Sequence, residues 1–409
     1  MSPSLQPTGG TWMGIAQIER DLVAFEGALG PWTPDYENAR VLVMDGAVPI
    51  AWIRLSPQDV NSSGVSRALD EAEVDSQIPV SPRNPEIVGT LCIAVCTRDR
   101  PEMLRICLER LLRIQEANAN EPYDVLVVDN APRSDANLHV IKALADKGLR
   151  VERVVEPRPG LSKARNAALE AASTDFVAFT DDDALPDHRW ASALHAGFSE
   201  DDRIGIVTGL AAPAEIVTTA QALFEQKVNW SDRLEAQTFS MDRRETYDWP
   251  FPYSAGHLGA GVNFALRRTV GVALGGFDEA LGAGTRTASG EDNEMFVRVL
   301  RAGHALRYEP AAIVWHVHRR TDAELRSLLY SYGKGLSAAA VREFLEPGRL
   351  DMVSGTIRGA WNLSHHRRGE LDSGMPTSHL IAEVAGVLVG PVAYAAERLA
   401  ARKHTNRSN

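Results

Sequence analysis

The chain has 409 residues, of which 44% are hydrophobic and 24% are charged. This ordinary composition excludes a disordered or fibrous protein and predicts one large core with a smaller accessory unit. The formal net charge of −11 excludes a general nucleic-acid binder, which would need a basic face, so no nucleic-acid partner is expected. Three cysteines and no signal-peptide pattern favour a reducing, cytoplasmic location.

Residues 1–88 are predicted to form a small accessory domain and a linker. Residues 12–29 are expected to contain a short helix, and residues 41–44 and 48–55 a hairpin around Asp45-Gly46. The segment 79–85 is rich in proline and is typical of a linker. The first 88 residues therefore indicate a β-rich appendage, to which the sequence assigns no function.

From residue 89 onward, strands are predicted to alternate with helices. Strands are expected at 91–96, 123–128, 151–155 and 176–179, separated by helices at 102–115, 135–147 and 162–172. This alternation predicts an α/β domain with a mostly parallel central sheet flanked by helices. We expect this domain to cover residues 89–325 and a helical region to cover residues 326–409.

Three consecutive carboxylates, Asp181, Asp182 and Asp183, follow the predicted central strand at 176–179. Adjacent like charges repel one another, so the arrangement becomes favourable chiefly when a cation lies among them. Carboxylate oxygens suit Mg²⁺ or Mn²⁺. A solvated acidic turn is the alternative, but open α/β sheets bind ligands beyond the carboxyl ends of their strands, which favours a metal and phosphate site.

Two further polar clusters lie later in the chain. Residues 290–294 open a predicted helix at 295–302, where carboxylates also complement the helix dipole. His316 and His318 lie at the end of a predicted strand, where alternation places both on one face. Each histidine could be a metal ligand or a structural residue. Gly261, in a glycine-rich stretch, would allow close approach of the backbone to a ligand.

Five motifs follow one another at the predicted strand and helix ends: Val95-Cys96-Thr97-Arg98-Asp99-Arg100-Pro101, Val127-Val128-Asp129-Asn130, Gly160-Leu161-Ser162-Lys163-Ala164-Arg165-Asn166, Phe179-Thr180-Asp181-Asp182-Asp183 and Gly290-Glu291-Asp292. This order resembles the family 2 glycosyltransferases with the GT-A fold, over residues 90–320. Each motif alone is weakly specific, whereas the five in order form a specific combination. The resemblance implies transfer of a sugar from a nucleotide-diphosphate donor to the hydroxyl of a glycan, lipid or small-molecule acceptor.

The resemblance also implies which residues bind the donor and the metal. The expected nucleotide-sugar ligands are Thr97, Arg98, Asp129, Arg165, Asp181, Asp182 and Gly261. A guanidinium suits phosphate oxygens because it is planar and always charged. The expected ligands of a divalent cation, Mn²⁺ or Mg²⁺, are Asp183, Asp181 and His316, with His318 as an open alternative.

The chemistry of sugar transfer assigns the remaining carboxylates. The departing nucleoside diphosphate needs its negative charge stabilised, which a metal does as a Lewis acid. The acceptor hydroxyl must lose a proton to a carboxylate within hydrogen-bond reach. Asp292 matches the base position of the family, and Glu291 is the second choice. One base and one displacement, without a covalent intermediate, predict inversion at the anomeric carbon.

Other functions stay open on the sequence alone. A sugar-phosphate nucleotidyltransferase shares this sheet topology and metal chemistry, although residues 97–101 lack the glycine-rich loop of that class. A non-catalytic module that binds nucleotide sugars is a second alternative, which the two acidic clusters disfavour. A dinucleotide dehydrogenase fits least, because no glycine fingerprint follows the first strand.

The C-terminal segment is apolar over residues 384–396 and is interrupted by Gly390-Pro391. It is expected to be too short and too broken to span a membrane. A helical hairpin, a buried core segment and a peripheral contact with the inner face of the membrane through residues 379–400 all fit this pattern.

Overall fold

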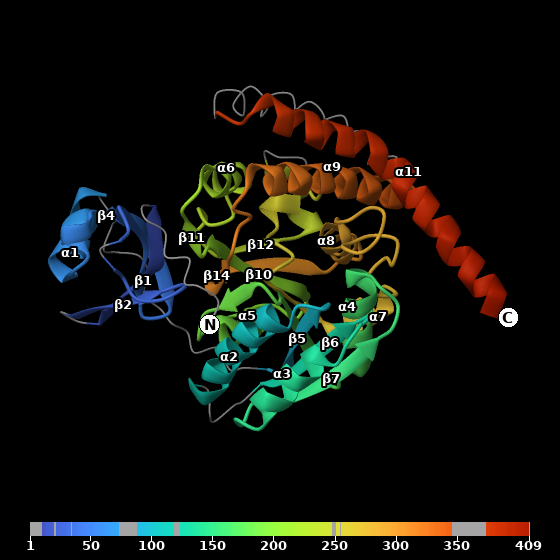
Figure 1. Cartoon of the computed structure of the whole chain (residues 1–409), viewed down its shortest axis with the longest axis horizontal. Coiled ribbons are helices and arrows are strands. Elements are labelled where there is room, and N and C mark those ends of the chain that lie inside the picture. Colours follow the sequence, from blue (N-terminus) through green and yellow to red (C-terminus); the bar gives the residue numbers. More distant parts are fainter. Residues whose placement is uncertain are drawn as a thin grey trace.

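The computed structural model describes residues 10–19, 22–33, 35–72, 88–117, 123–247, 251–253, 255–345 and 374–408. The first part of the chain forms a small five-stranded sheet that lies to one side of the larger sheet (Figure 1). Its own strands are β1 (Thr11–Glu19), β2 (Leu22–Gly27), β3 (Asn38–Asp45) and β4 (Val48–Leu55). The fifth strand, β11 (Glu215–Ile216), comes from the later part of the chain and pairs with β1.

The short helix expected within residues 12–29 is wrong, because β1 and β2 form an antiparallel pair there. Trp12 explains the preference for a sheet. A Cβ atom at Gly14 would lie 2.2 Å from the indole ring, and one at Gly27 would lie 2.8 Å from it, so the two glycines leave room for the ring across both strands. The hairpin predicted around Asp45-Gly46 is confirmed by β3 and β4. The predicted linker at 79–85 lies outside the described residues.

The small sheet is followed by η1 (Pro57–Asp59) and α1 (Ser62–Glu71), and residue 91 begins the larger sheet. The larger sheet has nine strands in the order β12-β14-β10-β13-β8-β5-β6-β7, with β9 paired to β14. Its strands are β5 (Leu91–Thr97), β6 (Asp124–Asn130), β7 (Val151–Glu156), β8 (Phe176–Asp181), β9 (Ala184–Pro186), β10 (Ile204–Pro213), β12 (Gln237–Phe239), β13 (Phe264–Arg267) and β14 (Ala305–His316).

Six of these strands run in one direction, and β9, β12 and β13 run against them. The prediction of a mostly parallel central sheet is therefore confirmed. The helices that connect and cover the strands are α2 (Pro101–Ala117), α3 (Ala136–Ala145), α4 (Leu161–Ala171), α5 (Trp190–Gly197), α6 (Thr219–Val228), α7 (Arg268–Ala273) and α8 (Glu291–Arg301), with the short turns η2 (Met241–Thr246) and η3 (Ala255–His257).

Both faces of the larger sheet are buried. Along β5, Cys92 and Ala94 belong to one apolar cluster, and Leu91, Ile93 and Val95 belong to the other. Alternation along a strand produces this division, because successive side chains point to opposite faces. A strand that is apolar on both faces is covered by helices on each side. Its polar residues therefore lie at the strand end, at the rim of the sheet.

Two long helices, α9 (Asp322–Phe344) and α11 (Thr377–Ser408), lie along another edge of the molecule, with α11 outside α9 (Figure 1). A Cβ at Gly333 would lie 2.1 Å from the carbonyl oxygen of Glu383, and one at Gly390 would lie 2.3 Å from that of Lys334. These contacts advance in the same direction along both helices, so α9 and α11 run parallel.

The predicted interruption of the C-terminal segment is therefore wrong, since α11 continues through Pro391. A helical hairpin is excluded for α9 and α11 by their parallel direction. Over residues 377–401, α11 is long and apolar enough to cross a membrane by length and composition alone.

Candidate active site

The register of the parallel strands brings the predicted motifs to one rim of the sheet. Strand β5 lies between β6 and β8, so that Thr97 is paired with Asp129 and Cys96 with Asp181. The short strand β9 pairs antiparallel with the end of β14, where Ala184 is opposite His316. Asp183 is therefore placed beside the end of β14 by a strand that directly follows the triple aspartate.

A cavity of about 370 Å³ lies at this rim. Of the predicted site residues, the cavity is lined by Thr97, Arg98, Asp181, Asp182, Asp183 and His316. Its wall also includes Cys96, Arg100, His318, Arg319 and Tyr332, which joins the cavity from α9. Segments separated by more than 200 residues thus form one pocket.

The three aspartates have different partners within the cavity. The hydroxyl of Thr97 donates to Asp182 over 2.7 Å. The guanidinium of Arg100 donates to Asp182 over 2.5 Å and to Asp183 over 3.0 Å. Arg319 approaches Asp183 to 3.9 Å. Two arginines therefore offset part of the negative charge.

Burial and charged neighbours together shift the pKa values of these groups in different directions. Loss of solvent raises the pKa of Asp181 to about 7, although Arg165 opposes the shift. Burial also raises the pKa of Asp182 to about 6, against the influence of Arg100 and Thr97. Burial opposes ionisation of Asp183, but the neighbouring His316, Arg100 and Arg319 hold its pKa below the usual value.

The donor chemistry of Asp181, Asp183 and His316 fits a divalent cation. Burial lowers the pKa of His316 to about 4, which leaves the neutral imidazole that a metal requires. Two carboxylates with a neutral imidazole suit Mn²⁺, and a cation would offset the desolvation of Asp181. Among the described residues, the ligand atoms of these three side chains do not all lie within 4.8 Å of one another, and one oxygen of Asp183 accepts from Arg100.

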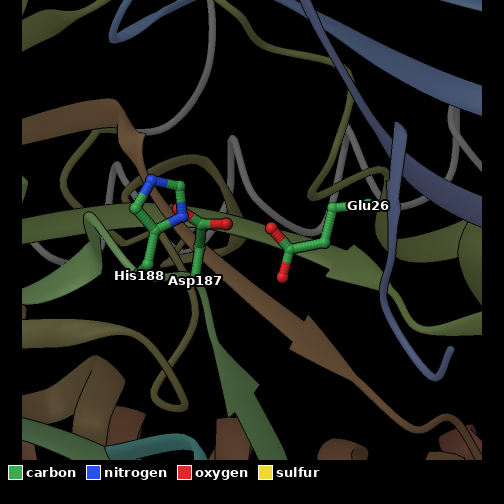
Figure 2. A group of neighbouring side chains, drawn as sticks. All are labelled: Glu26, Asp187 and His188. Atoms are coloured by element: carbon green, nitrogen blue, oxygen red, sulfur yellow. The ribbon is translucent and has the colours of Figure 1, made fainter. Parts of the chain in front are cut away.

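A different group meets that spacing among the described residues. Potential ligand atoms of Glu26, Asp187 and His188 lie within 4.8 Å of one another (Figure 2). Glu26 belongs to β2, whereas Asp187 and His188 follow β9, so the group joins the small sheet to the larger one. Arg110 also pairs with Glu26 over 3.3 Å. No sequence signal links these residues, because Glu26 is far from the other two along the chain.

The second predicted cluster lies behind the aspartates. Arg165 is only 2% exposed and does not line the cavity. Its guanidinium pairs with Glu291 over 3.0 Å, donates to the carbonyl of Gly261 over 2.9 Å and approaches Asp181 to 3.9 Å. Arg165 therefore joins α4, α8 and the end of β8 from beneath the cavity floor.

Asp292 lies against Gly261 at the start of α8. A Cβ at residue 261 would lie 2.0 Å from Oδ2 of Asp292, so only glycine fits there without moving the carboxylate. Burial, Asp292 and Asp181 together raise the pKa of Tyr332 above its usual value. Asp292 is not part of the cavity lining, but it lies next to the backbone of residue 261, whose carbonyl oxygen accepts from Arg165.

Asp129 is placed differently from the other predicted ligands. It is fully buried, accepts a hydrogen bond from Arg153 over 2.6 Å and another from Asn137 over 2.8 Å, and does not line the cavity. The next residue, Asn130, lines it instead. Its amide oxygen accepts a hydrogen bond from the backbone of Gly160.

Sequence reasoning missed Arg100, Arg319 and Tyr332. Arg100 lies inside the first motif, and its position four residues after Cys96 at a strand end was a usable signal. Arg319 follows the two histidines directly. Tyr332 lies in the middle of α9, and nothing in its local pattern distinguishes it from a packing residue.

Comparison with curated proteins finds glycosyltransferases. The chain is 31% identical over 231 residues to the pre-mycofactocin glycosyltransferase of Mycobacterium tuberculosis (strain CDC 1551 / Oshkosh). The aligned stretch covers 56% of this chain and 44% of that protein. It is 25% identical over 201 residues to the probable glycosyltransferase YdaM of Bacillus subtilis (strain 168), covering 48% of this chain and 44% of that protein. The chain thus spans less than half the length of these relatives.

Among solved structures, the mannosyltransferase PcManGT from Pyrobaculum calidifontis, in complex with GDP-Man and Mn²⁺, superposes with a TM-score of 0.48 and 17% identity. The match covers 78% of this chain and 88% of that one. Residues 92–270 match the family model described as glycosyl transferase family 2, which spans four of the five motifs. Over these residues, the chain is similar to glycosyl transferase family 2.

Proposed function

We propose that the chain is an inverting, metal-dependent glycosyltransferase that moves a sugar from a nucleotide-diphosphate donor to an acceptor hydroxyl. One observation carries the proposal: Asp181 and Asp183 line a cavity, and Arg165 joins Asp181 to the carbonyl of Gly261, against which Asp292 lies. A site for the leaving group and a carboxylate for the incoming alcohol are therefore close together.

The donor is proposed to enter along the ends of β5 and β8. Thr97 and Arg98 lie on the cavity wall, where they can contact the nucleoside, as the family resemblance implies. Asp182 is already fixed by Thr97 and Arg100. Asp129 and Arg165 support this wall from the buried side, because both are bound to protein partners there.

Asp181, Asp183 and His316 are proposed to hold a divalent cation, Mn²⁺ or Mg²⁺. When bound, such an ion stabilises the negative charge of the departing diphosphate. Arg100 can turn from Asp183 toward phosphate oxygens, since it is 39% exposed and its guanidinium keeps its charge.

Asp292 is proposed as the base that accepts the proton of the acceptor hydroxyl. Glu291 is less suited to that role, because Arg165 holds its carboxylate away from an incoming alcohol. Burial and the nearby Asp292 also raise the pKa of Glu291 to about 7, which lowers the fraction that can accept a proton at neutral pH. A single base opposite the leaving group gives inversion.

Incubation with a panel of UDP-, GDP- and TDP-linked sugars, with Mn²⁺ or with EDTA, tests this proposal. We expect slow hydrolysis of one donor that requires the metal and is lost in Asp183→Asn. Asp201→Asn, at an exposed ion pair with Arg203, is the matched control. Exchange of pyrophosphate into a nucleotide sugar would instead identify a nucleotidyltransferase, and binding without turnover a non-catalytic module.

We also propose a cytoplasmic location with peripheral contact to the inner face of the membrane through residues 379–400. Four apolar side chains, Ile381, Leu388, Val392 and Leu399, are between 58% and 73% exposed on α11. Their spacing of seven, four and seven residues places them along one face of the helix. Such a stripe fits a helix that lies on a lipid surface.

A further inference from the structure

A chain of hydrogen bonds leads from the cavity wall into the small N-terminal sheet. Nδ1 of His316 lies 3.0 Å from Nδ1 of His318. Nε2 of His318 lies 3.2 Å from Oε2 of Glu225, which is on α6. The other oxygen of Glu225, Oε1, accepts a hydrogen bond from Arg40 of β3 over 3.2 Å. The wall of the cavity and the N-terminal sheet are thus linked by four side chains.

The chemistry of these groups determines which atom donates in each hydrogen bond of this chain. An ionised carboxylate only accepts hydrogen bonds, so Nε2 of His318 donates to Glu225. In the neutral ring, Nδ1 of His318 then has a lone pair and accepts from Nδ1 of His316. Nε2 of His316 is left unprotonated, and no residue that the structure describes forms a hydrogen bond with it. An unprotonated ring nitrogen is the form that binds a metal.

The Glu225 end of this chain of hydrogen bonds is held firmly. The Glu225 side chain is 9% exposed, and that of Arg40 is 15% exposed. The hydroxyl of Ser231 also donates to Oε1 of Glu225. The guanidinium of Arg40 lies over the ring of Trp52, 4.5 Å from its centre. The guanidinium of Arg40 can only donate, so it requires an acceptor at Oε1 of Glu225, whereas the hydroxyl of Ser231 can donate or accept.

We propose that Glu225 and Arg40 are positioning residues that fix His316 in the tautomer whose Nε2 binds the divalent cation. The N-terminal sheet thereby contributes to a metal site that none of its residues contacts. This inference rests on the proposed function, because it assumes that His316 is a metal ligand. The inference also selects His316 over His318 as the metal ligand, since both ring nitrogens of His318 take part in hydrogen bonds.

A single substitution should reverse the direction of donation along these hydrogen bonds. In Glu225→Gln, the one remaining carbonyl must face Arg40, and the amide group must then donate to Nε2 of His318. His318 would donate through Nδ1 to His316, whose proton would move to Nε2 and block metal binding. We expect Mn²⁺ affinity, measured by calorimetry without donor, to fall by about ten-fold or more.

A second substitution should restore the original direction. In the double variant Arg40→Met with Glu225→Gln, no guanidinium demands the carbonyl, so the amide can turn and accept from His318. We expect Mn²⁺ affinity to recover toward the wild-type value. Asp232→Asn is the matched control, because Asp232 pairs with Arg40 over 3.1 Å on the exposed side and has no part in the chain.

Nitrogen-15 spectra of the imidazole rings in the metal-free protein provide a readout that a purely structural role would not move. The wild type should have His316 protonated at Nδ1, and Glu225→Gln should have it protonated at Nε2. Equal Mn²⁺ affinity in wild type and Glu225→Gln, or an unchanged tautomer, overturns the inference. A wild type that binds no Mn²⁺ overturns the metal dependence of the proposed function as well. Loss of affinity in Glu225→Gln without recovery in the double variant points to general damage and overturns only the role of the hydrogen-bond chain.

Discussion

At the scale of single residues, Asp292 is the base that we propose. Asp292→Asn keeps the size of the side chain but removes the proton acceptor, so we expect kcat for transfer to fall by about 100-fold or more. Donor affinity should stay close to wild type, because the aspartates at the end of β8 are untouched. Stopped transfer with retained donor binding, measured by calorimetry, is the expected outcome.

Glu291→Gln separates the two carboxylates. Because Glu291 pairs with the buried Arg165, its substitution should lower the melting temperature. We expect kcat to fall less than in Asp292→Asn. If Glu291→Gln stops transfer in a stable protein while Asp292→Asn remains active, the assignment of the base is reversed. Loss of donor binding in Asp292→Asn would indicate a structural role for that residue.

Gly261 offers a second test of the same geometry. Gly261→Ala brings a Cβ to 2.0 Å from Oδ2 of Asp292, so the carboxylate must move. We expect a large decrease in kcat with little change in Mn²⁺ affinity. Gly256→Ala is the control, since a Cβ there has no atom within 4 Å. Equal activity of the two variants would show that the position of Asp292 is not critical.

The triple aspartate could be predicted from the sequence because three carboxylates at the end of an apolar run conflict with ordinary folding. Thr97, Arg98 and His316 also lie on the cavity wall as the motif order suggested. The burial of Asp129 and Arg165 could not be predicted, since it depends on Arg153 and Glu291, which lie on other elements. Arg40 and Glu225 are separated by 185 positions, and no local pattern links them.

At the scale of elements, the strands of the parallel sheet could be predicted because each is apolar on both faces. The three-residue strand β9 could not, since it is too short for any periodicity. Its pairing with β14 nevertheless places Asp183 beside His316. The error at residues 12–29 has a similar origin, because the two glycines that disfavour a helix there are explained by the indole of Trp12 and by the backbone oxygens of Glu26 and Gly30.

The parallel packing of α9 and α11 depends on small residues. In Gly386→Val, the new side chain would start 2.1 Å from the carbonyl oxygen of Tyr330, so α11 must move away from α9. We expect a loss of about 1–3 kcal/mol in the free energy of unfolding, as for other overpacked sites. Ala395→Val, on the exposed side of α11, is the control in denaturant titrations. Equal stability of both variants would mean that α11 is not held by this contact.

At the scale of the whole molecule, the exposed stripe of α11 predicts binding to lipid. We expect the protein to sediment with vesicles of phosphatidylcholine and phosphatidylglycerol, and the double variant Leu388→Glu with Val392→Glu to lose most of that binding. Two carboxylates in an apolar helix face oppose both lipid contact and anionic headgroups.

Val272→Glu is the control for that experiment, because Val272 is 52% exposed on α7, away from the stripe. Absence of wild-type sedimentation would refute the membrane contact. A wild-type dimer in light scattering that the double variant disperses would assign the stripe to a second copy of the chain.

The alternation of strands and helices from residue 91 to residue 179 could be predicted from the sequence, whereas the attachment of the small sheet could not. Strand β11 is two residues long, yet it completes the small sheet at Thr11 and Trp12. Trp52 adds an edge-to-face contact with Trp315, and its indole nitrogen donates to Ser231. The boundary at residue 88 stays a prediction, and these contacts cross it.

This attachment bears on any attempt to shorten the protein. A fragment that starts at residue 89 would leave Glu215 and Ile216 without their neighbour strand and would expose one face of Trp315 to water. It would also strip the carboxylate of Glu225 of its guanidinium. Such a truncated protein would keep every residue proposed to bind sugar or nucleotide, yet it would not be a fair substitute for the intact one.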